Sequence, residues 1–185
     1  MRYSQDHKAQ THQRIIKEAS ARFRRDGIGA TGLQPLMKAL GLTHGGFYSH
    51  FSSKDELVEK ALQAASDELD EHCAMLFAQE KPLEAFIDSY LSEWHQTSPH
   101  QGCPLPTMSS ELGLRGQPSP TTDIVLNSRL EQVQEALGGE RADDESIVIM
   151  STLVGALLLS RSVENTELAQ RILDVARDYL KASHP

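Results

Sequence analysis

The chain has 185 residues, 39% of them hydrophobic, and a formal net charge of −8, so it can bury a core as one large domain or two small ones. Its two cysteines, Cys73 and Cys103, form no CxxC pair, which argues against a disulfide scaffold and a structural zinc site. The longest uncharged run, residues 146–160, is too short to span a membrane, and the polar N-terminus shows no signal peptide, so we expect a cytoplasmic protein without a membrane partner.

The charge is distributed unevenly along the chain. Residues 1–54 hold nine Lys and Arg against three Asp and Glu, whereas residues 55–185 hold nine against twenty-three. A basic segment joined to an acidic remainder is typical of a small nucleic-acid-binding module that a second domain carries. The basic segment could also be a solvated surface, but that would not explain why it contains the motif described below.

A stripe of apolar residues at helical spacing predicts the first helix: Ile15, Ile16, Ala19 and Phe23. Gly27 fits the end of this helix. Residues 27–32 then read Gly-Ile-Gly-Ala-Thr-Gly, which matches the letters of a dinucleotide-binding GxGxxG motif. That motif requires a preceding strand and a βαβ unit, and neither is predicted here, so we interpret residues 27–32 as a loop.

A helix-turn-helix pattern follows. Residues 33–40 have the apolar pattern of a short helix, and Gly41 fits the left-handed turn that ends a helix. Phe47 and Phe51 lie four residues apart and share one face of a second short helix. The other face presents three polar side chains: Thr43, which can cap the helix, His44 and Tyr48. The second helix of such a unit can lie in a DNA major groove.

Two glycines, Gly45 and Gly46, lie inside this second helix. Each costs a helix about 1 kcal/mol relative to alanine, so the order of the helix must come from packing of Phe47 and Phe51. In return, a backbone without side chains can approach another molecule closely. An ordinary helical hairpin with a tight turn remains the alternative interpretation.

Residues 31–57 resemble the DNA-binding signature of the TetR/AcrR family of bacterial one-component regulators. Six residues occupy the family's most typical positions: Gly41, Tyr48, His50, Phe51, Lys54 and Leu57. Two residues depart from the pattern. Pro35 is compatible with a helix if Gly32 is the N-cap, because an N3 amide needs no intrahelical partner. Gly46 replaces the usual Thr and removes a hydroxyl that could hold a phosphate.

The resemblance implies which residues contact DNA. In the family pattern Gln34 and His44 face base edges, and Tyr48 projects from the same helix face. His50 and Lys54 would contact phosphates. The expected DNA-binding residues are therefore Gln34, Thr43, His44, Gly45, Tyr48, His50 and Lys54.

The rest of the chain is predicted to be helical. Ser53 to Glu56 form a capping box that starts a long helix to about Glu80. We expect further helices over residues 82–94, over 104–112 with Cys103 as N-cap, up to residue 137, over 143–163 and over 165–182. We find no convincing strand. The predicted fold is all-α with about nine helices: a three-helix DNA-binding domain in residues 1–54, and an effector-binding and dimerisation domain in residues 55–185.

The uncharged run of residues 146–160 predicts a helix buried on nearly all sides, which is hard to achieve in a small chain without a partner subunit. Gly155 and Ala156 allow close helix approach. We therefore expect a homodimer formed by the last two helices. The expected interface residues are Ile149, Leu153, Ala156, Leu157 and Leu173.

The second domain is rich in aromatic and sulfur-containing residues. Most of them can be explained as core. The resemblance implies that several line an effector pocket between helices, for which the candidates are Phe77, Phe86, Tyr90, Trp94, Cys103, Met108 and Met150. The segment around Cys103 also resembles a branch of the family in which a cysteine at this place sometimes senses oxidants or electrophiles. An N-cap thiol would feel the positive end of the helix dipole, which favours the thiolate; the alternative is a small packing residue.

The sequence does not suggest an enzyme. It contains no GxSxG, HExxH, P-loop or CxxC motif, and we expect neither a cofactor nor a metal. His95, His100 and Cys103 are the nearest approach to a ligand set. The favoured function is a homodimeric repressor that binds a palindromic double-stranded DNA operator and is released by a small-molecule effector or by thiol modification. The alternative is a helical ligand- or protein-binding adaptor that does not bind DNA.

Overall fold

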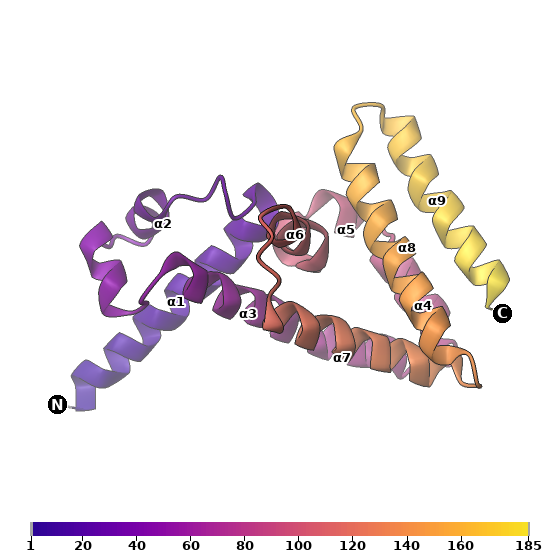
Figure 1. Cartoon of the computed structure of the whole chain (residues 1–185), viewed down its shortest axis with the longest axis horizontal. Helices are drawn as coiled ribbons and strands as arrows, with labels where there is room; N and C mark the ends of the chain where they lie inside the picture. The colour runs from indigo at the N-terminus through magenta and orange to yellow at the C-terminus, as the bar shows by residue number, and fades with distance from the viewer. Residues whose placement is uncertain (1, 185) are drawn as a thin grey trace. The chain divides into compact units, whose positions relative to one another are not determined.

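The computed structural model describes residues 2–184, with the side chains of residues 6–184. Every regular element in this part of the chain is a helix, which confirms the all-α prediction (Figure 1). Within residues 2–184 the structure has nine α-helices, together with three short helical segments of other types. None of the described helices combines the length and apolar character that a membrane span would need.

The described chain divides into two compact units. Unit 1 comprises Met1–Glu68 and His100–Thr121, and unit 2 comprises Leu69–Pro99 and Thr122–Pro185. This division differs from the expected boundary at residues 54 and 55, because the helix α3 (Lys54–Phe77) runs without a break from one unit into the other. The functional division into a DNA-binding and an effector-binding part remains a prediction.

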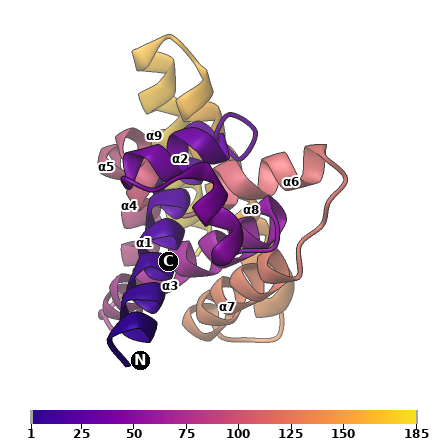
Figure 2. The ribbon, with the colours of Figure 1, turned by 90° about the vertical axis from the view of Figure 1, so that its left-hand side faces the viewer.

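Unit 1 begins with α1 (Arg2–Asp26) and α2 (Leu33–Ala39), which lies across α1 (Figure 2). The stripe of α1 predicted from the sequence is its core face, since Ile15, Ala19 and Phe23 are fully buried. Gly32 is the N-cap of α2 in an extended conformation, which places Pro35 at the third helical position, where no backbone donor is required.

The turn after α2 has the geometry that its sequence predicts. Gly41 has a φ of +73°, and the N–H groups of Gly41 and Leu42 donate to the carbonyls of Lys38 and Met37 at 3.0 and 2.9 Å. This pair of hydrogen bonds is a Schellman motif, which needs a left-handed residue at Gly41. Thr43 then caps the next helix, because its Oγ1 accepts from the N–H of Gly46 at 3.2 Å.

Two details of the following elements differ from expectation. The second short helix is a 3₁₀-helix, η1 (His44–Ser49), rather than an α-helix, in keeping with its two glycines. The capping box at the start of α3 is only half formed. Ser53 Oγ accepts from the N–H of Glu56 at 3.0 Å, but the Glu56 carboxylate accepts from the N–H and hydroxyl of Ser52 instead, both at 2.7 Å.

The segment expected as one helix over residues 104–112 is irregular. It contains η2 (Pro99–Gln101), the π-helix η3 (Leu105–Ser109) and α6 (Ser110–Leu114). Pro104 is the N-cap of η3, so the expectation that Cys103 is a helix N-cap was wrong. Pro106 supplies no backbone donor inside this segment, which hinders a regular hydrogen-bond ladder.

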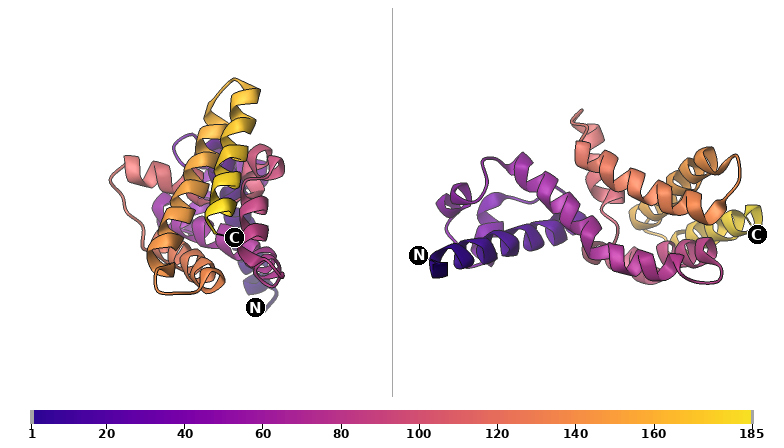
Figure 3. Two further views of the ribbon diagram at one scale, coloured as in Figure 1. Left: turned by 90° about the vertical axis from the view of Figure 1, so that its right-hand side faces the viewer. Right: turned by 90° about the horizontal axis from the view of Figure 1, so that it is seen from below.

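Unit 2 contains α4 (Pro82–Tyr90), α5 (Glu93–Thr97), most of α7 (Pro120–Leu137), α8 (Ala142–Ser162) and α9 (Thr166–Ser183). The helix expected to run to Trp94 is interrupted at Leu91, because the Ser92 hydroxyl accepts from the N–H of His95 and starts α5. The helices α8 and α9 lie side by side as an antiparallel hairpin (Figures 1 and 3).

Candidate nucleic-acid interface

The start of α2 and the whole of η1 present an exposed polar surface. Gln34, Thr43, His44 and Gly45 are exposed, and Tyr48 is 61% exposed. The Tyr48 ring meets the ring of His44 edge-on, with 6.0 Å between centroids and 84° between planes. A Cβ added at Gly45 would meet no atom within 4 Å, so its backbone is open to an approaching molecule. The structure therefore brings five of the seven expected DNA-binding residues to an accessible part of the helix-turn-helix.

The opposite face of η1 is anchored in the core of unit 1. Phe47 is fully buried, Phe51 is 2% exposed, and their rings stack with 5.3 Å between centroids. His12 from α1 stacks on Phe51 at 4.5 Å. These contacts supply the order that a 3₁₀-helix with two glycines lacks by itself.

His50 is half-buried beside α1. Its ring lies 6.0 Å from that of His12, and its pKa is lowered, first by burial and then by the nearby charges of His12 and Lys8. The pKa of His12 is also lowered, mainly by burial and by Lys60. Both imidazoles are therefore neutral at pH 7. A phosphate contact from His50 would be made by a neutral N–H donor, not by a cation.

Lys54 has a different position from the one expected. Its Nζ donates to the backbone carbonyls of Ile28 and Thr31, both at 2.6 Å, in the loop between α1 and α2. Burial lowers its pKa, and the Arg115 guanidinium lowers it further. We therefore reassign Lys54 from a phosphate contact to a residue that holds this loop.

The expected effector-pocket residues are divided between the two units. Phe77, Phe86 and Tyr90 form a cluster of rings in unit 2, with 4.9 and 5.8 Å between successive centroids. Met150 is also buried in unit 2, but Trp94 is 53% exposed and so does not line an enclosed site. The other two, Cys103 and Met108, are buried residues of unit 1.

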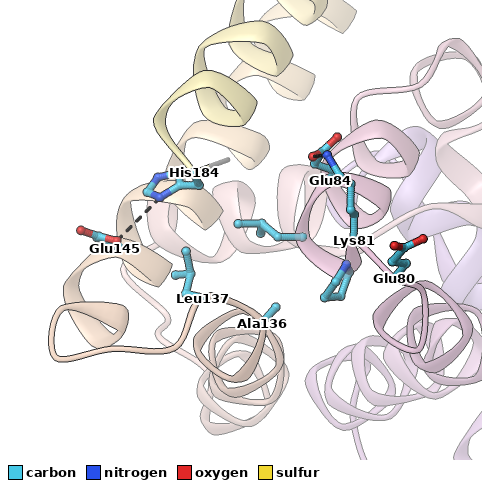
Figure 4. Close-up of a pocket in the computed structure, with 9 residues that line it drawn as sticks. Glu80, Lys81, Glu84, Ala136, Leu137, Glu145 and His184 are labelled. Atoms are coloured by element: carbon cyan, nitrogen blue, oxygen red, sulfur yellow. Dashed lines mark hydrogen bonds and ion pairs between the residues drawn. The ribbon is translucent and has the colours of Figure 1, made fainter.

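Unit 2 holds a cavity that the sequence did not indicate. Its volume is about 350 Å³, and four separate parts of the chain line it: residues 80–84, residues 136–137, Glu145 and His184 (Figure 4). His184 Nδ1 lies 3.7 Å from a carboxylate oxygen of Glu145, and Lys81 forms an ion pair with Glu84 at 2.5 Å. Because these residues are distant in sequence and share no motif, no sequence signal could have assembled them.

The expected dimer interface also needs correction. Ile149, Leu153, Leu157 and Leu173 are fully buried within the protomer, so they cannot contact a partner without unpacking its core. The apolar surface of α8 and α9 is instead a groove of about 610 Å³ on the other side of the hairpin. Its lining comprises Ser151, Thr152, Gly155, Ala156, Leu159, Leu168, Arg171, Ile172, Val175, Ala176 and Tyr179, of which only Ala156 was expected.

Comparisons with known proteins agree with this interpretation of unit 1. Residues 15–61 match the family model described as bacterial regulatory proteins, tetR family. The chain is 24% identical to the HTH-type transcriptional regulator LmrA of Bacillus subtilis, covering 92% of this chain and 97% of LmrA. It is 27% identical to the uncharacterized HTH-type transcriptional regulator YxaF of the same organism, covering 81% and 84%.

Solved structures share the fold over nearly the whole chain. A TetR-family transcriptional regulator from Agrobacterium tumefaciens has a TM-score of 0.78 at 18% identity, covering 95% of this chain and 98% of that one. NemR of E. coli, in its reduced form, has a TM-score of 0.75 at 18% identity, covering 94% and 96%. TetR-family regulators are not enzymes. Residues 15–61 are a TetR-family N-terminal domain, and the chain is a DNA-binding transcriptional regulator of that type.

Proposed function

We propose that the protein is a homodimeric repressor that binds a palindromic DNA operator through α2 and η1. The observation that carries this proposal is the division of η1 into two faces. Phe47 is buried against the helices behind it, whereas His44 and Tyr48 project from the opposite side. The basic character of residues 1–54 supports the same surface, because it favours approach to phosphates.

Each exposed group on this surface has a suitable chemistry. Gln34 and His44 carry donors and acceptors that can pair with base edges in the major groove. Thr43 Oγ1 already accepts from Gly46, so its hydroxyl hydrogen is available for a phosphate oxygen. Gly45 allows the backbone to approach the DNA closely, and the Tyr48 hydroxyl can reach the sugar-phosphate chain.

The groove between α8 and α9 is the proposed dimer interface. Its lining is predominantly apolar, and Gly155 and Ala156 allow a partner helix to approach closely. A second copy of the same hairpin would bury this surface in a four-helix interface. Two such protomers would present their η1 surfaces to half-sites about 34–36 Å apart, or a multiple of that distance.

Release from the operator is proposed to follow binding of a small molecule in unit 2 or modification of Cys103. Either event would favour a dimer conformation in which the two η1 surfaces no longer match successive major grooves. The ring cluster around Phe86 and the cavity beside Glu145 are the candidate sites for a reversible ligand. For thiol chemistry the support is the likeness in fold to NemR, whose reduced form was solved. Against it, Cys103 is only 8% exposed.

Selection of bound sequences from a random DNA pool tests the proposal. We expect the full chain to enrich a palindrome, to bind it as two protomers, and to lose affinity steeply as salt increases. In a reporter strain, transcription from a promoter that overlaps this site should fall when the protein is present. Enrichment of no sequence, or equal binding to selected and scrambled DNA, would contradict the proposal.

The two triggers can be separated with one variant. Operator binding is measured for wild type and Cys103→Ser before and after treatment with a mild oxidant or a reactive aldehyde. Loss of binding in the wild type alone would favour thiol modification. Equal sensitivity in both proteins, or none in either, would leave a reversible ligand as the trigger.

A further inference from the structure

The loop between α1 and α2, residues 27–32, has a charged partner more than eighty residues away in the sequence. The N–H of Gly29 donates to Oε2 of Glu111 in α6 at 2.8 Å. Arg115 Nη2 donates to the same oxygen at 3.0 Å. All three residues belong to unit 1. A hydrogen bond from a backbone N–H to a carboxylate is among the stronger ones in proteins, so the contact fixes the loop.

Two of the three glycines of this loop, Gly27 and Gly29, lie against the Glu111 and Arg115 side chains. A Cβ built on Gly27 would lie 2.0 Å from Oε1 of Glu111, and one built on Gly29 would lie 3.1 Å from Nη2 of Arg115 and 3.3 Å from Oε2 of Glu111. Gly27 also has a φ of +90°, which side chains other than hydrogen rarely allow. The segment that resembles a dinucleotide-binding GxGxxG motif, residues 27–32, therefore accommodates the Glu111 side chain of the same protein.

The other side of the loop is held by a cation. Lys54 Nζ donates to the carbonyls of Ile28 and Thr31. The loop therefore donates one N–H to the Glu111 carboxylate and accepts two hydrogen bonds from the Lys54 ammonium. The loop leads directly to Gly32, the N-cap of α2, and Gln34 follows two residues later. The position of the loop therefore determines the position of the first turn of α2.

The segment that carries Glu111 is attached to α1 at a second point. Arg24, which is 2% exposed, donates to the carbonyl of Gly102 at 3.1 Å and to the Glu68 carboxylate at 2.6 Å. The segment His100–Thr121 thus contacts α1 at Gly102 and the α1–α2 loop at Glu111, and the chain passes from each end of the segment into unit 2.

We infer that Glu111 is a positioning residue for operator binding, because its carboxylate sets the α1–α2 loop and, through it, the placement of Gln34 against DNA. Displacement of the Glu111 carboxylate from Gly29 would then be the event by which a movement of the His100–Thr121 segment weakens DNA binding. The inference rests on the proposed operator contact of Gln34.

The test compares operator affinity for wild type, Glu111→Ala and Glu111→Gln, with Asp55→Asn as a charge-matched control from the same unit. We expect Glu111→Ala to bind the selected operator about tenfold more weakly, within the usual range of coupling between sites. Glu111→Gln keeps an oxygen acceptor for Gly29 and should stay within about threefold of wild type. Removing a negative charge without a positioning effect would strengthen DNA binding, as expected for Asp55→Asn, so the predicted sign is distinctive.

Two further readouts distinguish positioning from loss of stability. Hydrogen exchange at the Gly29 amide should accelerate in Glu111→Ala, whereas exchange at the Gly45 amide should not change. In a double-mutant cycle, Gln34→Ala should cost less affinity in the Glu111→Ala background than in the wild type. If Glu111→Ala does not fold, Glu111→Asp carries the test, because its shorter side chain keeps the charge but withdraws the carboxylate from the Gly29 N–H, so operator binding should weaken and exchange at Gly29 should accelerate.

Wild-type operator affinity in Glu111→Ala, with unchanged Gly29 exchange, would overturn the inference and leave operator binding intact. Additive costs for Glu111→Ala and Gln34→Ala would also overturn it. Failure of the wild type to bind any selected DNA would instead overturn the proposed function, and Gly29 exchange would still report on the Glu111 contact.

Discussion

The Nδ1–H of His95 donates to the backbone carbonyl of Tyr90, 2.7 Å away, across the break between α4 and α5. The two rings also meet edge to face, with 4.8 Å between their centroids. His95 is 5% exposed, and the backbone carbonyls of His95 and Gln96 accept from the Arg161 guanidinium of α8. This imidazole therefore sits, as a neutral donor, where three helices of unit 2 meet.

Acid should destabilise unit 2 through His95. Burial is the main reason that its pKa falls to about 4, and the charges of Arg161 and His72 lower the pKa further, against the opposing effect of the Tyr90 hydrogen bond. Because the folded pKa lies below that of the unfolded chain, the unfolded state binds the proton better between pH 6.5 and 4. The contribution of His95 is complete above pH 6.5 and is lost as pH falls through this window, up to about 3 kcal/mol.

Urea unfolding between pH 7.5 and 4 measures this effect. The free energy of unfolding of the wild type should fall more steeply below pH 6.5 than that of His95→Gln, which can keep the hydrogen bond to Tyr90 without titrating. His7→Gln serves as the control, since His7 is an exposed histidine of unit 1. Parallel pH profiles for wild type and His95→Gln would contradict the prediction.

Signals that lie within a few residues of each other were predicted well. The turn at Gly41 and the cap at Thr43 depend on neighbours in the chain, and both form as expected. Only half of the capping box at Ser53 forms, because the hydroxyl of Ser52 is an equally near partner for Glu56. Local chemistry thus located the helix-turn-helix and its exposed face.

Features that depend on distant parts of the chain could not be predicted. The carboxylate of Glu111 accepts from the N–H of Gly29 and would lie 2.0 Å from a Cβ at Gly27, but the sequence does not connect Glu111 with this loop. The core face of α8 could not be predicted from its uncharged run either. Its periodicity does not say which apolar face packs on the protomer's own helices, and Leu153 proved to be on the core side while Leu159 is 55% exposed.

Gln34→Ala and His44→Ala should each weaken binding to the selected operator. We expect a loss of about 1–3 kcal/mol and a broader sequence preference, because each side chain would pair with a base edge. Gel-shift titrations with the operator and with single-base variants measure both effects. Gln79→Ala, an exposed glutamine of unit 2, is the matched control. Unchanged affinity in both recognition variants would mean that the base-contacting residues lie elsewhere.

Lys54→Ala should lower stability and leave the salt dependence of DNA binding unchanged. The ammonium donates to Ile28 and Thr31, so its loss leaves two carbonyls of the loop without this partner. A lysine that contacts a phosphate would behave differently, since its removal reduces the slope of log affinity against log salt by about 0.9. Thermal unfolding and affinity measured between 50 and about 200 mM salt, the range in which such slopes are apparent, separate the two roles.

A charge placed in the groove between α8 and α9 should prevent dimer formation. Val175 is 59% exposed in the protomer and lines the groove, so Val175→Glu should fold normally but would bury an unpaired carboxylate in a dimer. Met75 is equally exposed on α3 and does not line the groove, which makes Met75→Glu the control for an added surface charge. In sedimentation, Val175→Glu should be a monomer at micromolar concentration, and Met75→Glu should remain a dimer.

DNA binding should follow the oligomeric state. A monomer makes the contacts of one half-site only, so Val175→Glu should bind the full palindrome with the affinity of the wild type for an isolated half-site. Leu153→Glu would be a poor test, because Leu153 is fully buried within the protomer and a charge there would unfold unit 2 whether or not a dimer exists. A Val175→Glu protein that sediments as a dimer would show that the groove is not the interface. A wild-type monomer at the same concentration would remove the dimer from the proposed mechanism.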